Sequence, residues 1–358
     1  SDVLVGAPGQ DPTYGFFGGA YLYLGSPSGL SANEAWYTAS TDAYSDFGAS
    51  VASAGDVNGD GYADVLIGDA AAAFGGEVSV YLGSASGLEA SRSSALYGPG
   101  AHNEEFGFSV AGAGDVNGDG YADIIVGAPN DFPGGTAYLS YGCGAWPYCD
   151  DPWEFSAGQT DADLGHSVAS AGDVNGDGYA DVLIGAPLWD AGQTDEGRVH
   201  LFLGSPLGLE SVAHWTADGD EAFAQAGVSV ASAGDVDADG YADVILGAPQ
   251  YQDGEADEGR ATLYLGSPSG LHDAAPWVGE RDQADAGLGY SVASAGDVNG
   301  DGFDDVIVGA NLYDGGQVDE GAAFVYLGSS SGLEPSAAWS AESDQADAGY
   351  GVAVASAG

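Results

Sequence analysis

The stretch GDVNGDGYAD, at residues 55–64, decides how the rest of the chain is interpreted. Near-copies of it begin at Gly114, Gly172, Gly234 and Gly296, so one acidic, glycine-rich decapeptide occurs five times. The first aspartates of successive copies are 59, 58, 62 and 62 residues apart. A repeat with a period of about 60 residues indicates a fold made of stacked copies of one structural unit.

Every unit has the same parts in the same order. A run ending in small residues, such as SVASAG, precedes the decapeptide, and an apolar run such as DVLIGAP (181–187) follows it. An alternating segment such as GRATLYLG (259–266) comes next, and a SPSGL-type turn then leads to a segment that usually carries tryptophan. Short runs of this kind, bounded by Gly, Pro, Asn and Asp, are typical of strands in hairpins. Four strands in about 60 residues is the content of one propeller blade.

We therefore predict an all-β protein, a β-propeller of four-stranded antiparallel blades in which six repeat units are visible. The chain ends on YGVAVASAG (350–358), the first strand of a unit without its acidic loop. It begins on SDVLVGAP (1–8), the strand that should follow such a loop. These ends complement each other and predict a six-bladed ring closed by both termini, which leaves no exposed sheet edge. The alternative is a seven-bladed propeller with one unit outside the chain.

Two features of the unit predict how the blades pack. The continuous apolar run DVLIG is typical of a strand that is buried on both faces, whereas the small residues of SVASAG suit a crowded position near the axis. We expect the recurrent tryptophan to fill the space between adjacent blades rather than to bind a ligand. Its copies are Trp36, Trp153, Trp215, Trp277 and Trp339.

The charge of the chain restricts its partners. Asp and Glu number 55 against four Lys and Arg, which gives a net charge of −51. Nucleic acid is excluded as a partner and an anionic membrane surface is disfavoured, because polyanions need Lys and Arg to displace their counterions. No apolar run approaches the ~20 residues of a membrane span. Cations are the expected binding partners, although the role of many of the acidic residues is only to keep a repetitive β protein soluble.

The acidic decapeptide has the pattern of a cation-binding loop. Oxygen donors recur at its first, third and fifth positions, which are Asp56, Asn58 and Asp60, and Asp64 closes the loop at the ninth. A glycine at the sixth position permits the sharp turn that brings these side chains to one point. In calcium loops, positions one, three and five give side-chain oxygens and position seven gives its backbone carbonyl. The aspartate at position nine and the strand that follows distinguish this loop from an EF-hand.

Five complete loops predict about five Ca²⁺ sites, one per loop. The fourth loop reads DVDADGYAD, so Asp237 replaces Asn and Ala238 replaces Gly, while every donor position is kept. The alternative is a metal-free turn capped by Asx side chains, in which the crowded carboxylates would raise one another's pKa values. The predicted ligands are Asp56, Asn58, Asp60, Tyr62 and Asp64; Asp115, Asn117, Asp119, Tyr121 and Asp123; Asp173, Asn175, Asp177, Tyr179 and Asp181; Asp235, Asp237, Asp239, Tyr241 and Asp243; and Asp297, Asn299, Asp301, Phe303 and Asp305.

The two cysteines, Cys143 and Cys149, enclose the pentapeptide GAWPY. Two thiols so close together in a lysine-free, acidic chain predict a local disulfide and an oxidising compartment. A pair of reduced cysteines is the alternative. A metal or redox site of the CxxC type is not expected, because the spacing differs and no second pair exists.

Taken together, these motifs resemble FG-GAP repeats, the units of the β-propeller of integrin α subunits. FG occurs at Phe47-Gly48 and Phe106-Gly107, and GAP occurs in four units, for example at 127–129 and 185–187. The resemblance covers essentially the whole chain, and the near-identical repeats are most similar to those of bacterial secreted FG-GAP proteins. It implies one FG-GAP β-propeller domain over residues 1–358, with about six repeats and calcium on one rim. Integrin propellers have seven blades, and here GAP decays to Gly68-Asp69-Ala70 in one unit and to GAN in another.

The main function that these observations favour is a calcium-stabilised, integrin-like module for extracellular adhesion or protein recognition. Such a module would be secreted or lie at the cell surface, meet a protein or cell-surface partner, and be compatible with a place in a larger protein or assembly. The alternative is a carbohydrate-binding, lectin-like propeller with pockets between blades. An enzyme is not expected, because the sequence has no nucleophile elbow, Walker loop or zinc triad, and its five histidines fall at different phases of the repeat.

A second acidic pattern precedes the third strand of some units. It reads DAGQTDEG at 190–197, DGEADEG at 253–259 and DGGQVDEG at 314–321. The simplest interpretation is a solvated turn, and the functional alternative is additional calcium or a rim that faces a partner. The disulfide loop, with Trp146 and Tyr148, is a second candidate for partner contacts.

Overall fold

The computed structural model describes residues 2–9, 18–40, 42, 45–72, 75–98, 104–147, 149 and 152–356. Strands, turns and bends account for the regular structure of these residues, and none of them lies in a helix. The predicted all-β class is therefore confirmed. The chain divides into two compact units, Ser1–Val168 and Ala169–Ser356, and the division falls within the fourteenth strand.

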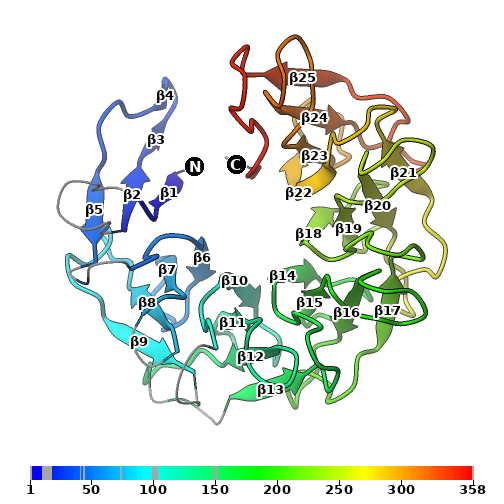
Figure 1. Ribbon diagram of the computed structural model, residues 1–358. Coiled ribbons are helices and arrows are strands. Elements are labelled where there is room, and N and C mark those ends of the chain that lie inside the picture. Colours follow the sequence, from blue (N-terminus) through cyan, green and yellow to red (C-terminus); the bar gives the residue numbers. More distant parts are fainter. Residues whose placement is uncertain are drawn as a thin grey trace. The chain divides into compact units, whose positions relative to one another are not determined.

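The first unit contains three blade-like sheets, whose strands follow one another in chain order (Figure 1). A small hairpin of β3 and β4 extends the connection between β2 and β5. The bounds are β1 (Val3–Ala7), β2 (Gly19–Tyr23) and β5 (Trp36–Ala39) in the first sheet, with β3 (Gly25–Ser26) and β4 (Gly29–Leu30) in the small hairpin; β6 (Val51–Gly55), β7 (Asp64–Asp69), β8 (Glu77–Tyr81) and β9 (Ser94–Tyr97) in the second; and β10 (Ser109–Gly114), β11 (Asp123–Ala128), β12 (Thr136–Ser140) and β13 (Trp153–Ser156) in the third.

The second unit contains three further four-stranded sheets with the same order of strands. Their bounds are β14 (Ser167–Gly172), β15 (Asp181–Ala186), β16 (Arg198–Phe202) and β17 (Trp215–Asp218); β18 (Ser229–Gly234), β19 (Asp243–Ala248), β20 (Arg260–Tyr264) and β21 (Trp277–Glu280); and β22 (Leu288–Gly296), β23 (Asp305–Ala310), β24 (Ala322–Tyr326) and β25 (Trp339–Glu342). These are the antiparallel blades of a six-bladed β-propeller, as the repeat predicts.

The start of the chain forms the predicted strand as β1, whereas the described part of the C-terminal segment does not. In the described residues 350–356, Tyr350 makes an isolated bridge with Gly321 and no strand is assigned. The sheet of β1, β2 and β5 therefore has three strands in the part of the chain that the structure describes. Closure by both termini and the single-domain organisation stay predictions.

The second strand of five blades forms the core, as its apolar sequence predicts. Every residue of β7, β11, β15 and β19 is buried, and so is all of β23 except one partly buried residue. A strand flanked by neighbours and covered on both faces has no need for polar alternation. This buried strand fixes where the loop before it ends, and so places the closing aspartate in the interior.

The glycines of the FG and GAP motifs allow neighbouring blades to touch through backbone. The N–H of Gly107 donates to the carbonyl of Gly127 at 3.1 Å within one blade. A Cβ on Gly127 would collide with the carbonyl oxygen of Gly165, which belongs to the connection after that blade. Ser109 Oγ donates to that same carbonyl at 2.7 Å. Only glycine permits so close an approach, which explains the residue pair that recurs in each motif.

Tryptophan occupies the groove between blades, as expected, at three of its copies. Trp36, Trp215 and Trp277 each meet a tyrosine of the following blade edge-on, with ring centroids 4.8–4.9 Å apart. The indole of Trp277 also donates to the carbonyl of Glu334 at 3.1 Å. Trp339 does not follow this pattern, because its side chain is 51% exposed. The disulfide between Cys143 and Cys149 is formed, as predicted.

Candidate metal loops

The five acidic loops occupy the same place in five blades. Each joins the first strand to the second, so the loops follow β6, β10, β14, β18 and β22. The glycines at the fourth and sixth positions have left-handed backbone, with φ of 74° at Gly59 and 90° at Gly61. Ala238 adopts the same region at φ 56°, where the other loops have glycine. This backbone turns the loop tightly enough for alternate side chains to share one side.

The first aspartate of each loop gathers backbone N–H groups. Asp56 Oδ1 accepts from Gly59 at 2.7 Å and from Asp60 at 3.0 Å, while Oδ2 accepts from Gly61 at 2.7 Å. At the last loop these donors, that of Gly302 foremost, lower the pKa of Asp297. Each carboxylate oxygen has two lone pairs. Oδ2 accepts only one bond from the loop, so it can still bind a cation.

The third and fifth positions converge on the first. The N–H of Asp60 lies 3.0 Å from Asp56 Oδ1 and 2.9 Å from Asn58 Oδ1, so one donor brings both oxygens together. Asn58 Nδ2 then donates to Asp60 Oδ2 at 3.2 Å. In the fourth loop, carboxylate oxygens of Asp235, Asp237 and Asp239 lie within 4.8 Å of one another. The structure therefore assembles oxygen atoms from positions one, three and five around a common point, and this donor set suits a hard cation.

The closing aspartate, which the sequence predicts as a metal ligand, accepts hydrogen bonds from two backbone N–H groups in the structure. Asp64 is fully buried, and its two oxygens accept from Val57 at 2.9 Å and from Gly83 at 2.7 Å. Equivalent pairs of bonds hold Asp123, Asp181, Asp243 and Asp305. It thus ties the loop to the end of the third strand. Its role as a metal ligand stays a prediction.

Burial strongly raises the proton affinity of three of the closing carboxyls. Desolvation raises the pKa of Asp123, Asp181 and Asp243 to about 7 against the opposing effect of their backbone donors, and the acids at the loop's other positions raise it further. A bound cation would favour the charged form of these groups. These carboxyls lose hydration when they are buried, and this disfavours their charged form. A cation near the loop would offset that cost, so their raised pKa values are compatible with a metal site.

Three of the loops, the first, third and fourth, are also bonded to the blade that follows them. Asp56 accepts at its backbone carbonyl from Ala122 at 3.0 Å, and Val57 accepts from Cys143 at 2.9 Å. The ring of Tyr121, the residue at position seven of the next loop, packs against Gly59 so closely that a Cβ there would lie 2.5 Å from the ring. Position seven thus has a packing role that sequence reasoning missed. Ordering one loop therefore orders the junction between two blades.

The second acidic pattern is a self-contained turn with a buried acid. In the hairpin before β16, Glu196 Oε1 accepts from the backbone of Ala191 at 2.6 Å and of Gln193 at 3.0 Å, and Glu196 is 3% exposed. Glu258 and Glu320 are buried in the same position before β20 and β24. The solvated-turn interpretation is right for the tips of these hairpins and wrong for their glutamates. The signal was present in the sequence, because the glutamate recurs at a fixed place directly before glycine.

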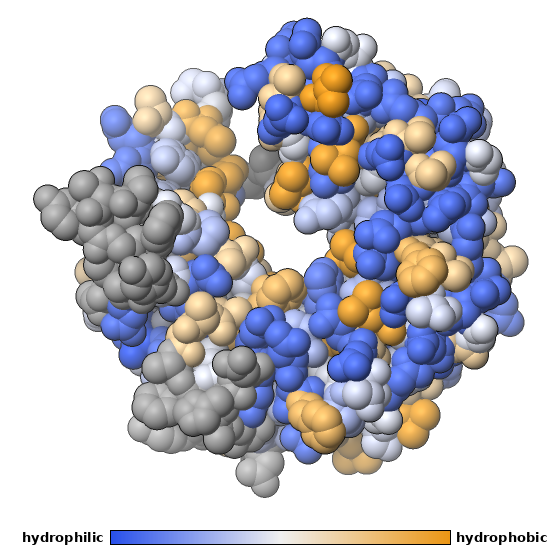
Figure 2. All heavy atoms as spheres, in the orientation of Figure 1, coloured by the Kyte–Doolittle hydropathy of each residue, from blue (hydrophilic) through white to orange (hydrophobic). Residues whose placement is uncertain are grey.

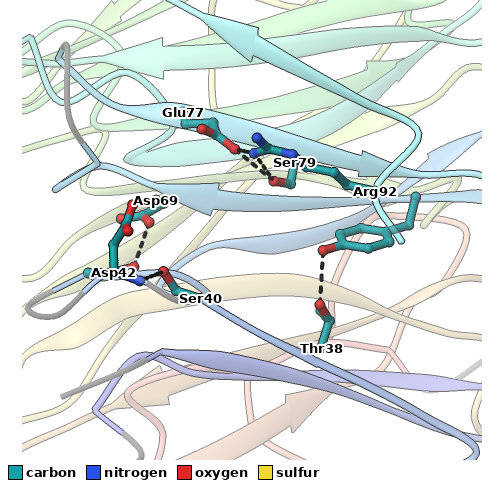
Figure 3. A network of polar contacts seen from close by, with 9 residues as sticks. Thr38, Ser40, Asp42, Asp69, Glu77, Ser79 and Arg92 are labelled. Carbon is teal, nitrogen blue, oxygen red and sulfur yellow. Dashed lines mark hydrogen bonds and ion pairs between the residues drawn. The ribbon is translucent and has the colours of Figure 1, made fainter. Parts of the chain in front are cut away.

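A polar pocket of about 280 Å³ lies between the sheet of β1, β2 and β5 and the sheet of β6–β9. Figure 3 shows part of its network, in which Arg92 pairs with Glu77. Ser45 Oγ also donates to Asp69 at 2.5 Å. Tyr81 and Thr38 share a hydrogen bond of 2.9 Å between their hydroxyls. Burial raises the pKa of Asp69, which stands where the five other blades have alanine. Sequence reasoning noted this departure from GAP without connecting it to a pocket.

The exposed surface is predominantly hydrophilic. In the view of Figure 2, hydrophilic residues predominate over the turns of β18–β21 and β22–β25, and apolar residues occur singly or in small groups. Within the described residues no helix has the length and hydropathy needed to cross a membrane.

Comparison with known proteins gives one family and a set of relatives. The model of the FG-GAP repeat matches residues 47–81, 106–140, 164–202, 226–264 and 288–326, together more than half of the chain. Integrin alpha-5 of Xenopus laevis is 33% identical over 242 residues, which are 64% of this chain and 22% of that protein. Human integrin alpha-IIb is 33% identical over 218 residues, which are 57% of this chain and 20% of that protein. The matched part thus spans about a fifth of these relatives. Among solved structures, Saccharomyces cerevisiae Sqt1 aligns with a TM-score of 0.49 at 10% identity, covering 88% of this chain and 67% of that one.

Proposed function

Because the chain belongs to the FG-GAP repeat family, we propose that it is a calcium-stabilised module for adhesion or protein recognition outside the cell. The observation that carries this proposal is the fivefold loop, in which oxygens from positions one, three and five converge beside a buried carboxylate. The residues that would hold each ion are those at positions one, three, five and nine, with the backbone carbonyl of position seven. The calcium would supply charge neutralisation and cross-linking of the turn.

Calcium would act on the stability of the blade junctions. Extracellular calcium modules have dissociation constants of about 10⁻⁴–10⁻³ M. At roughly millimolar calcium, each site then adds about 0.4–1.4 kcal/mol to the free energy of unfolding. Five sites together add on the order of 2–7 kcal/mol, which is comparable to the whole stability of a domain. Since the first, third and fourth loops are bonded to the next blade, this stabilisation would hold those neighbouring blades together as well as the hairpins themselves.

The recognition role follows from the relatives and the surface. The relatives that this chain resembles are integrin alpha chains, and the strongly acidic composition suits an extracellular module that meets a protein or cell-surface partner. The connections between blades, which vary in length, are the natural place for partner contacts. The proposal assigns no catalytic residue and no membrane-spanning segment.

The test of calcium stabilisation is thermal unfolding of the full chain in millimolar calcium and in excess chelator. We expect a large rise in melting temperature with calcium, and calorimetric titration should give about five sites per chain. Magnesium at the same concentration is the control for ionic strength. An unchanged melting temperature after stringent chelation would overturn the structural role of the metal.

The carbohydrate-binding alternative rests on the polar pocket beside Arg92. Its carboxylates, guanidinium, hydroxyls and the ring of Tyr81 are groups that can bond the hydroxyls of a small sugar and contact its ring. A glycan array distinguishes the two functions. A sugar signal that is lost in Asp69→Ala would favour the alternative; alanine is the residue that the five other blades have at this place. A silent array together with capture of a protein partner would favour recognition of protein.

A further inference from the structure

The fourth acidic loop differs from the others at its third position. In the other four loops an asparagine stands there, and its Nδ2 donates to the aspartate at position five at 2.9–3.2 Å. Asp237 has no proton to donate in its charged form. Its carboxylate instead lies among those of Asp235 and Asp239, with oxygens within 4.8 Å of one another. The other four loops have a hydrogen bond from asparagine to aspartate at this place, whereas the fourth loop has three carboxylates close together.

A fourth acid reaches the same loop from the next blade. Asp304 Oδ2 accepts from the backbone N–H of Asp235 at 2.9 Å. The residue at this place beside the first and third loops is alanine, Ala122 and Ala242, each in contact with the glycine before its loop. The junction between β18–β21 and β22–β25 therefore carries an extra negative charge at the start of the fourth loop.

The fourth loop also differs from the others in its backbone. Ala238 replaces the glycine of the other loops and is held at φ 56°. Alanine has fewer conformations to lose than glycine when the loop becomes ordered. The left-handed conformation costs about 1 kcal/mol, so it persists only where other contacts enforce it. Here the N–H of Asp239, the next residue, bonds to Asp235 and Asp237 at 3.0 and 3.2 Å.

From these three differences we infer that the fourth loop is the highest-affinity calcium site of the chain and that Asp237 sets its affinity. The inference rests on the proposed function. Calcium affinity rises with the charge and the rigidity of the ligand set. In the fourth loop the ion relieves repulsion between carboxylates, whereas in the other loops it must replace the bond from Asn to Asp. As the calcium concentration falls, this loop is the last to lose its ion. The junction of β18–β21 with β22–β25 therefore stays stabilised at the lowest calcium concentrations.

The test is calcium titration of the calcium-free full chain by calorimetry, with a competing chelator to resolve tight binding. We expect one tight site and about four weaker ones. Asp237→Asn restores the residue of the other loops and should weaken the tight site about tenfold or more, within the range that charge count produces. The matched control is Asn175→Asp in the third loop, which should create a second tight site. Terbium luminescence, sensitised by the tyrosines at position seven, gives an independent readout of site occupancy.

Two outcomes separate this inference from the function on which it rests. Five sites of equal affinity, unchanged in Asp237→Asn and in Asn175→Asp, would overturn the inference and leave the calcium-stabilised module intact. No calcium binding in any variant would overturn both. The Asn175→Asp variant keeps the test decisive if Asp237→Asn folds poorly, because it predicts a gain of affinity in a separate loop.

Discussion

Trp146 Nε1 donates a hydrogen bond of 3.0 Å to Ser94 Oγ. Ser94 is the first residue of β9, and the first residue of β5, β13, β17, β21 and β25 is tryptophan. The indole that β9 lacks is thus supplied by the loop that the Cys143–Cys149 disulfide closes in the following blade. Trp146 packs beside a core cluster of the first unit, so this side chain has a structural role. Contact of the loop with a partner stays a prediction, and Tyr148 lies outside the described residues.

The first prediction concerns this substitute indole. Trp146→Ala should lower the free energy of unfolding by about 2 kcal/mol, somewhat less than for a fully buried tryptophan because the side chain is only partly buried. Urea unfolding followed by tyrosine and tryptophan fluorescence measures this. Ser94→Trp in the Trp146→Ala background should recover most of the loss, since it restores the arrangement of the other blades. A loss below about 0.5 kcal/mol would show that the indole does not hold the two blades together.

The second prediction concerns the seam between blades. A Cβ on Gly247 would collide with the carbonyl oxygen of Gly289, so Gly247→Ala should cost about 3 kcal/mol or more by forcing backbone apart. Gly192→Ala is the matched control, because nothing lies within 4 Å of its Cβ position and its φ is not left-handed. The control should be neutral or stabilise by up to about 1 kcal/mol. Comparable midpoints in chemical denaturation for the two variants would refute the close-approach explanation of the motif.

The third prediction separates the structural role of the closing aspartate from any role in binding metal. Asp243→Asn keeps one acceptor but turns an amide N–H₂ toward the N–H of Val236 or Gly266, both of which donate to this carboxylate. We expect a loss of about 2 kcal/mol even in excess chelator at pH 8. Asp239→Asn at the exposed fifth position should change stability by less than about 0.5 kcal/mol under the same conditions. Equal effects of the two variants in chelator would contradict the anchoring role.

The fourth prediction concerns acid sensitivity. His200 is 3% exposed, and burial lowers its pKa to about 4, so the folded protein holds the ring neutral. The unfolded chain takes up this proton near pH 6.5 and the folded chain only near pH 4, so unfolding becomes more favourable as pH falls between these values. The loss approaches about 3 kcal/mol at the acid end. Above pH 7 the group contributes no pH dependence.

The variant that checks this is His200→Phe, because Phe324 occupies the equivalent place in β24. The difference in unfolding free energy between the variant and the parent should grow steadily from pH 7 to pH 4. Taking this difference cancels the contribution of the many carboxylates that titrate in the same range. A difference that stays constant over this interval would rule out a buried neutral His200.

Much of the architecture could be predicted from the sequence because it is written in local patterns. The alternation and turn chemistry of one unit identify four strands, and the fivefold recurrence identifies blades without reference to any long-range contact. The acidic loop is equally local, since the oxygens of Asp56, Asn58 and Asp60 are brought together by the turn that contains them. For these features the covalent spacing of the residues already determines the geometry.

Other features were decided only by the tertiary structure, because they depend on which backbone groups meet across a blade or between blades. Asp64 is placed by local spacing, but its second oxygen is taken up by Gly83, which lies at the end of the third strand. Glu196 and Trp146 looked like surface residues of variable loops, and their partners, the turn of the hairpin and Ser94, became neighbours only through folding. The sequence by itself determined the repeat, the strands and the loop that gathers oxygen atoms. The folded chain decided which acids are buried, because burial depends on surfaces that meet only when blades pack.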